Sequence, residues 1–158
     1  MKLSFRKGFS FGLTSAVITT LGLIVGLESS TNSRLIVISG ILTIAVADAF
    51  SDALGIHVSE ESSNNRTKRE IWEATISTFL TKFVFALTFL VPFLFLQLSP
   101  AIVVALVWGF IILIVMSYRI GQEGKASPKE VITEHLLIAT AVIIITSALG
   151  KLINHLFI

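Results

Sequence analysis

The sequence has no cysteine and few charged residues. Without cysteine, the chain can form neither a disulfide framework nor a thiolate metal site. Only 14% of its 158 residues are charged and 54% are hydrophobic, whereas about a quarter of a typical soluble domain is charged. The mean hydropathy is +0.89. This composition excludes an ordinary soluble domain and indicates that much of the protein surface faces lipid.

Long hydrophobic runs are present instead, separated by short polar segments. A helix that crosses a bilayer needs about 20 mostly apolar residues, and five segments qualify: 8–27, 35–57, 72–97, 100–120 and 130–157. The first run is too long for a signal peptide, and no A-x-A cleavage site follows it. Ser127, Pro128 and Glu130 predict a helix start with an N-cap, a first-turn proline and a capping-box acid. We therefore expect an all-α membrane protein, one domain of five transmembrane helices over residues 1–158.

Basic residues indicate the orientation of these spans. Nine of them precede the first span or lie in the second and fourth connections: Lys2, Arg6, Lys7, Arg66, Lys68, Arg69, Arg119, Lys125 and Lys129. The opposite side has only Arg34 and Lys151. Because cytoplasmic loops are enriched in Lys and Arg, we expect a cytoplasmic N-terminus and an outside C-terminus. Topology or anionic lipid explains these scattered charges, so nucleic-acid binding is not expected. The short loops favour a prokaryotic plasma membrane.

Small residues recur along the first span at intervals of four: Gly8, Gly12, Ala16 and Thr20, with a second pair at Gly22 and Gly26. Such a stripe lets two helices approach closely inside a membrane. It predicts a helix contact, and a homodimer interface through the first helix is one form that this contact could take. Glycine is also common in membrane helices for other reasons, so the stripe alone does not establish that another helix packs against it.

Ionisable residues at membrane depth are the main functional signal. Asp48 and Asp52 lie one helical turn apart in the second span, and Lys82 lies at a similar level of the third. Such groups face the bundle interior and mark ion or proton pathways. A carboxyl that shares space with another also binds a proton more readily, which suits a proton carrier. We expect a metal or proton site formed by Asp48, Asp52, Ser15, Thr19, Glu60, Glu61, Glu134 and His135, with Lys82 as the charge partner.

Each of these residues also has a structural interpretation. Asp48 could form an ion pair with Lys82 that serves packing alone, whereas Asp52 has no equally obvious cation. Glu60 and Glu61 could belong to a solvated helix end. Glu134 could be interfacial, and His135 could be a hydrogen-bonded helix residue.

Three segments resemble the family of vacuolar iron and manganese transporters (the VIT/CCC family). The stretch GLTSAVITTLGLIVGL, residues 12–27, is similar to the first span of that family through Gly12, Leu13, Thr19, Thr20, Leu23 and Gly26. SDALGIHVS, residues 51–59, resembles the end of its second span through Ser51, Gly55, Val58 and Ser59, and ALGKLI resembles a motif near its C-terminus. The resemblance implies a five-helix protomer, a homodimer paired through the first span, and exchange of metal ions for protons.

The sequence departs from the family pattern at the positions that bind metal. The first-span aspartate of the family aligns with Ser15, the second-span methionine with Asp52, and the following glutamate with Ile56. The acidic metal-binding region between spans two and three is reduced to a short polar connection. Replacing a thioether with the Asp52 carboxylate favours harder ions such as Mn²⁺ or Fe²⁺.

Three classes of function follow from these residues. The first is a proton-coupled exporter of Fe²⁺ or Mn²⁺, in which the metal is cargo and no cofactor is needed. The second is a membrane scaffold or subunit whose buried charges only specify packing. The third is a metal-dependent phosphotransferase, because D-x-x-x-D matches half of the CDP-alcohol phosphotransferase signature. Its other half, D-G-x-x-A-R, is absent, so we do not expect an enzyme.

Overall fold

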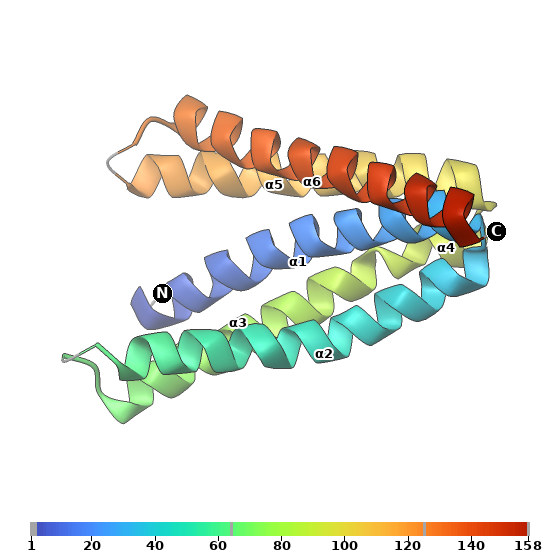
Figure 1. Cartoon of the computed structure of the whole chain (residues 1–158). Coiled ribbons are helices and arrows are strands. Elements are labelled where there is room, and N and C mark those ends of the chain that lie inside the picture. Colours follow the sequence, from blue (N-terminus) through green and yellow to red (C-terminus); the bar gives the residue numbers. More distant parts are fainter. Residues whose placement is uncertain (1–2, 64, 125, 158) are drawn as a thin grey trace.

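The computed structural model describes residues 3–63, 65–124 and 126–157, and nearly all of them are helical. Within these ranges the helices are α1 (Leu3–Thr31), α2 (Arg34–Glu61), α3 (Lys68–Thr88), α4 (Leu90–Phe95), α5 (Leu98–Glu123) and α6 (Pro128–Phe157). With α3 and α4 taken as one segment, five helical segments are long and apolar enough to cross a membrane. The predicted all-α architecture with five transmembrane helices is confirmed, and the chain is an integral membrane protein. The described N- and C-terminal ends lie at opposite ends of the bundle (Figure 1).

The third span is divided in two, which the sequence analysis did not predict. α3 ends at Thr88 and α4 begins at Leu90, with Phe89 between them. Pro92 is the physical reason, because it has no N–H to donate to the Thr88 carbonyl and its ring crowds that carbonyl. The Phe89 N–H instead donates to the Ala86 carbonyl at 3.2 Å, the tighter bond of a helix end.

The short α4 ends at an unusual polar cap. The Arg34 guanidinium donates to the carbonyl oxygens of Phe93 at 2.6 Å and Leu94 at 3.0 Å. These carbonyls belong to the last turn of α4, where no intrahelical donor is available. Arg34 therefore joins the start of α2 to the end of α4 at this end of the bundle.

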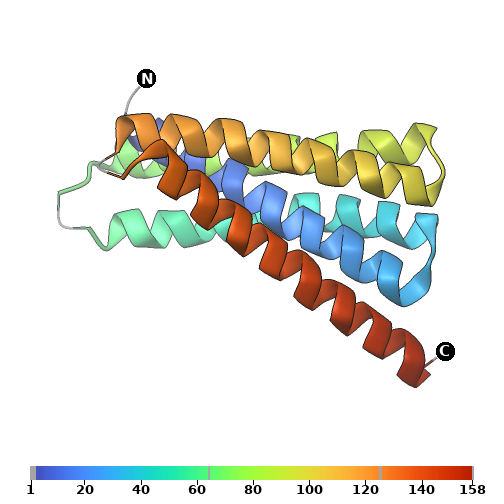
Figure 2. The ribbon, with the colours of Figure 1, turned by 90° about the horizontal axis from the view of Figure 1, so that it is seen from above.

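α1 is the central helix. It contacts α2 and α3 on one side and α5 and α6 on the other, and both ribbon views show this arrangement (Figures 1 and 2). Half of its most apolar 18-residue window is buried, against 11% for α6. Figure 2 also shows α6 crossing the bundle obliquely. The molecule thus has two halves, α1–α2–α3 and α1–α5–α6, which share one helix.

The stripe of small residues on α1 lies inside the chain. Gly8, Gly12, Ala16 and Thr20 are all buried within a single copy, and a Cβ at Gly12 would lie 2.7 Å from the Thr78 carbonyl oxygen of α3. Gly8 and Gly12 pack against α3, and burial of all four residues within one copy leaves none of them on the surface where a homodimer interface was expected. A stripe of small residues serves a contact within a chain as well as one between chains, and the sequence pattern does not distinguish the two.

The second glycine pair and the predicted helix cap also have defined contacts. Gly26 lies against α6. A Cβ added at Gly150 of α6 would overlap the Gly26 carbonyl oxygen. At the start of α6, the Ser127 N–H donates to Glu130 Oε2 at 3.0 Å, and the Glu130 N–H donates to Ser127 Oγ at 3.3 Å. The predicted capping box is confirmed.

Candidate cation and proton site

The Lys82 ammonium lies between three of the predicted site residues. Its Nζ is 2.6 Å from Asp48 Oδ2, it donates to Ser15 Oγ at 2.8 Å, and it also contacts Asp52 Oδ2. Lys82 comes from α3, the two aspartates from one face of α2, and Ser15 from α1. These four residues, which we call the Lys82 cluster, therefore join all three helices of one half of the molecule.

The cluster lies deep in the membrane-spanning segments. Lys82 is 14 residues from the start of α3 at Lys68, and Asp48 is 13 residues from the end of α2 at Glu61. At 1.5 Å per residue these separations are both about 20 Å, so the two groups share one level of the bundle. The Lys82 side chain is 2% exposed, and those of Asp48 and Asp52 are 26% and 20% exposed. A charged group at such a depth costs about 2.5–3.5 kcal/mol even on lenient scales, so mutual pairing is what stabilises the three ions.

Charge in the cluster is not balanced. One ammonium faces two carboxylates, which gives a formal charge of −1 when all three groups are ionised. The sequence analysis paired Lys82 with Asp48 and found no clear cation for Asp52. The structure shows that one cation contacts both, because carboxylates at i and i+4 lie on the same helix face.

Asp48 also borders an open groove on the outer face of α1 and α2. The groove has a volume of about 740 Å³ and carries the polar residues Thr19, Ser39, Thr43, Asp48 and Ser51. The Thr19 hydroxyl donates to the Ser15 carbonyl at 2.9 Å, and the Thr43 hydroxyl donates to the Ser39 carbonyl at 2.8 Å. Their protons are therefore used within the helix, while the hydroxyl oxygens keep lone pairs that can accept a hydrogen bond or bind a cation.

Three of the polar residues in this groove were not expected from the sequence. Ser39, Thr43 and Ser51 occur at multiples of four along α2, a spacing that places them on one helix face. That spacing is a usable signal, but single hydroxyl residues are common in membrane helices and Thr43 bonds its own backbone. The relation to Asp48 becomes visible only when α1 and α2 are packed together.

Glu60 lies in a different environment from the Lys82 cluster. Its carboxylate is fully buried, with the Lys7 ammonium against one oxygen and Arg66 Nε 3.0 Å from the other. It joins the start of α1, the end of α2 and the connection that follows. Glu60 was expected among the ligands of the metal or proton site, but in the structure both of its oxygens are engaged by cations. Glu61, its neighbour, is exposed and stands outside this ion-paired group.

Glu134 and His135 lie on α6, in the other half of the molecule. The Glu134 side chain is exposed, and His135 Nδ1 is 2.7 Å from Ser117 Oγ of α5. Both were expected in the site from the sequence. In the structure α1 stands between α6 and the α2–α3 pair (Figure 1), so the structure does not bring them to the Lys82 cluster.

The predicted site is therefore smaller than expected. Asp48, Asp52, Ser15 and Lys82 come together and Thr19 lies in the adjoining groove, whereas Glu60, Glu61, Glu134 and His135 lie elsewhere. In the part of the chain that the structure describes, no group of three or more His, Asp or Glu side chains is positioned to hold a metal ion. What remains is a two-carboxylate site occupied by a lysine.

Comparison of the sequence with protein-family models and with curated proteins found no match. The resemblance to vacuolar iron and manganese transporters thus rests on the short segments quoted above.

Proposed function

We propose that the protein is a membrane transporter that exchanges a divalent cation, Mn²⁺ or Fe²⁺, for protons. The observation that supports this most directly is the Lys82 cluster. A buried ammonium occupies the space between two carboxylates at membrane depth, and one of these carboxylates also borders an open groove whose mostly apolar walls carry four hydroxyl side chains. Buried ionisable groups inside a membrane are expensive, and they mark ion pathways by default.

The charges of Lys82, Asp48 and Asp52 suggest how the site would exchange a metal ion for protons. With Lys82 in place, the cluster carries −1, and when the ammonium withdraws, Asp48 and Asp52 carry −2, which matches one divalent cation. Carboxylate and hydroxyl oxygens are hard ligands that suit Mn²⁺ and Fe²⁺ better than Cu⁺, and Ser15 and Thr19 supply neutral oxygens nearby. Two protons would neutralise the same carboxylates. Metal, protons and Lys82 therefore compete for one pair of carboxylates, which is the basis of exchange.

The distribution of basic residues supports an orientation of the protein in the membrane. The N-terminal end of the bundle carries Arg6, Lys7, Arg66, Lys68, Arg69, Arg119 and Lys129, and the other end carries Arg34 and Lys151. By the positive-inside rule, the first end is cytoplasmic and the C-terminus is outside. We propose export from the cytoplasm across a prokaryotic plasma membrane.

A homodimer remains part of the proposal, with a different interface. The stripe of small residues on α1 is buried within one copy, whereas Thr43, Asp48 and Ser51 on α2 leave polar groups on the outer face. Polar groups of this kind are unfavourable against lipid tails. We propose that a second copy covers this face of α1 and α2 and encloses the groove.

Uptake of Mn²⁺ into proteoliposomes under an imposed pH gradient tests the function. The native chain should take up Mn²⁺ in a pH-dependent way, and Asp52→Asn should abolish uptake because it removes one of the two charges that the cation needs. Glu61→Gln is the matched control, since it removes an exposed carboxylate away from the cluster, and it should leave uptake unchanged. Normal uptake by the Asp52→Asn variant, or none by the correctly folded native protein, would refute the proposal.

A membrane scaffold is the second candidate, and the complete pairing of Lys82 favours it. Lys82 already has three polar partners within the chain, which is what a group that only specifies packing requires. The two functions differ in whether the native protein binds metal. If titration of Mn²⁺ in detergent leaves the melting temperature unchanged at all concentrations, the scaffold is favoured over the transporter.

A further inference from the structure

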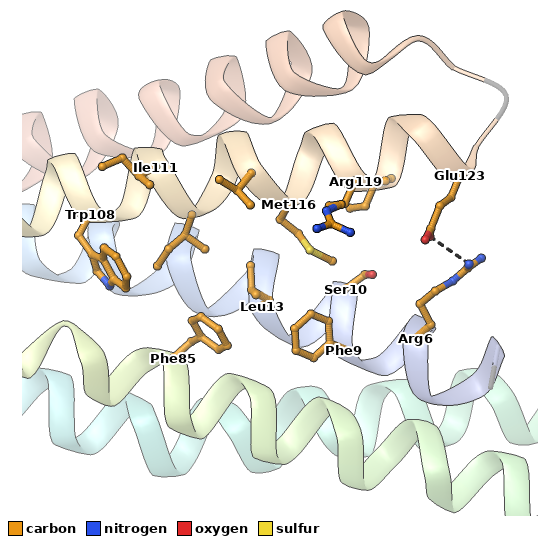
Figure 3. Close-up of a pocket in the computed structure, with 13 residues that line it drawn as sticks. Arg6, Phe9, Ser10, Leu13, Phe85, Trp108, Ile111, Met116, Arg119 and Glu123 are labelled. Carbon is orange, nitrogen blue, oxygen red and sulfur yellow. Dashed lines mark ion pairs between the residues drawn. The ribbon is translucent and has the colours of Figure 1, made fainter. Parts of the chain in front are cut away.

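A second groove lies on the opposite side of α1 from the α2 face. It has a volume of about 450 Å³ and is bounded by α1, α3 and α5. Figure 3 shows Phe9 and Leu13 from α1, Phe85 from α3, and Trp108 and Met116 from α5 converging on the space between these helices. The walls are almost entirely apolar over this length. The groove opens on the side of the bundle, where a membrane protein meets lipid tails.

One end of the groove is strongly polar and carries excess positive charge. Arg6 and Glu123 form an ion pair there at 3.0 Å, with side chains 40% and 51% exposed. Arg119 lies one helical turn before Glu123 and lines the same groove (Figure 3). It is exposed and has no hydrogen bond or ion pair among the residues that the structure describes. The end of the groove thus offers one unpaired guanidinium beside a second one that is partly accessible.

The length of the groove matches one leaflet of a bilayer. Arg119 and Trp108 are 11 residues apart on α5, which is about 16 Å at 1.5 Å per residue. The hydrocarbon core of a bilayer is about 30 Å thick, so each leaflet contributes about 15 Å. A ligand with its charged part at Arg119 and its apolar part along the groove would end near Trp108, close to the middle of the membrane.

We propose that this groove binds an anionic phospholipid from the leaflet at the basic end of the bundle. The phosphate would lie against the Arg119 and Arg6 guanidinium groups, and one acyl chain would lie along Phe9, Phe85 and Met116. Basic pockets between transmembrane helices bind anionic lipid headgroups, and guanidinium groups suit phosphate oxygens. A free phosphate would use only the polar end and would leave the apolar walls uncovered. The proposal is independent of which ion, if any, the protein transports.

Tryptophan fluorescence can test this proposal, because the chain has only two tryptophans. Trp108 lines this groove, whereas Trp72 lies beside His57 in the contact between α2 and α3. In a Trp72→Phe variant, Trp108 is the sole reporter. The protein is placed in bilayers of ordinary phosphatidylcholine that contain a low mole fraction of one brominated lipid. This lipid is phosphatidylglycerol in one sample and phosphatidylcholine in the other, and both carry bromine on their acyl chains. Brominated phosphatidylglycerol should quench Trp108 several-fold more than brominated phosphatidylcholine.

Charge substitutions separate a specific site from general attraction to the surface. Arg119→Gln should bring quenching by the anionic lipid down to the phosphatidylcholine level, and folding should be retained because Arg119 is exposed and unpaired. Lys129→Gln is the matched control, since it removes one exposed charge from the same end but outside the groove, and the preference should persist. Inorganic phosphate added to the buffer should not relieve the quenching.

Four results would overturn the proposal. The first is equal quenching of Trp108 by the two brominated lipids. The second is a Lys129→Gln effect as large as that of Arg119→Gln, and the third is the same lipid preference at Trp72 in a Trp108→Phe variant. Either of these two would show only enrichment of anionic lipid around the protein. The fourth is relief of quenching by inorganic phosphate, which would assign the polar end to a soluble anion.

Discussion

The Lys82 cluster predicts how stability depends on the number of charges left behind by substitution. The native cluster has one ammonium and two carboxylates. Asp48→Asn or Asp52→Asn leaves one ammonium with one carboxylate, which is a balanced pair. Lys82→Met leaves two carboxylates with no cation, and the double change of both aspartates to asparagine leaves a buried ammonium alone. The loss of stability should therefore increase with the net charge that remains in the cluster, and the single Asn variants should lose the least.

The magnitudes can be worked from the burial of Lys82. Removing one partner of a buried ion pair costs about 3–5 kcal/mol, because it leaves an uncompensated charge, and the Lys82 side chain is 2% exposed. For a chain of this size each kcal/mol corresponds to about 2–4 °C, so Lys82→Met should lower the melting temperature by about 6–20 °C. A single Asn variant keeps an oxygen that accepts a hydrogen bond from Lys82, and it should lose only about 1 kcal/mol.

Thermal unfolding of the purified protein in detergent, followed by circular dichroism, measures these differences. The triple variant Lys82→Met, Asp48→Asn, Asp52→Asn is the matched control, because it removes all three charges and should recover much of the stability lost in Lys82→Met. A Lys82→Met variant that is destabilised less than either single Asn variant would contradict this order of stabilities. A triple variant as unstable as Lys82→Met would attribute the loss to packing around the lysine stem rather than to charge.

Two further predictions concern the helix contacts. Gly12→Leu should prevent folding or destabilise the folded protein by several kcal/mol, because even a Cβ there would lie 2.7 Å from the Thr78 carbonyl oxygen. Gly55→Leu is the matched control, because Gly55 has open space around it. Equal yields of folded protein for the two variants would contradict the close α1–α3 contact. Arg34→Ala should lower the melting temperature by several degrees and increase proteolysis near α4, because two carbonyl oxygens lose their charged donor. Unchanged proteolysis would show that this cap contributes little.

The fold could largely be read from the sequence. Apolar runs of membrane-spanning length predicted all five spans, since lipid requires a continuous helix whose backbone groups are all bonded internally. The Ser127–Glu130 capping box was also predictable, because it depends on residues three apart. The break at Phe89 was missed, although Pro92 is a local signal that could have indicated it.

The candidate site was only partly predictable. Helical depth placed Asp48 and Lys82 at similar levels, with Glu134 nearer the end of its helix, but depth describes only the position along the bundle axis. Position around the axis depends on which helix neighbours which, and α1 separates Glu134 from the other two (Figure 1). Glu60 was expected in the same site, and only packing shows that Lys7 and Arg66 enclose it.

The sequence by itself determined that this is a five-span helical membrane protein with polar groups at one depth of the second and third helices. These properties are periodic or local, so they are visible in a linear string. Only helix packing shows that Gly8 and Gly12 lie against α3, that one lysine contacts both aspartates, and that a groove with a basic end opens between α1 and α5. Each of these depends on the order of helices around the bundle axis, which side-chain packing sets and hydropathy does not record.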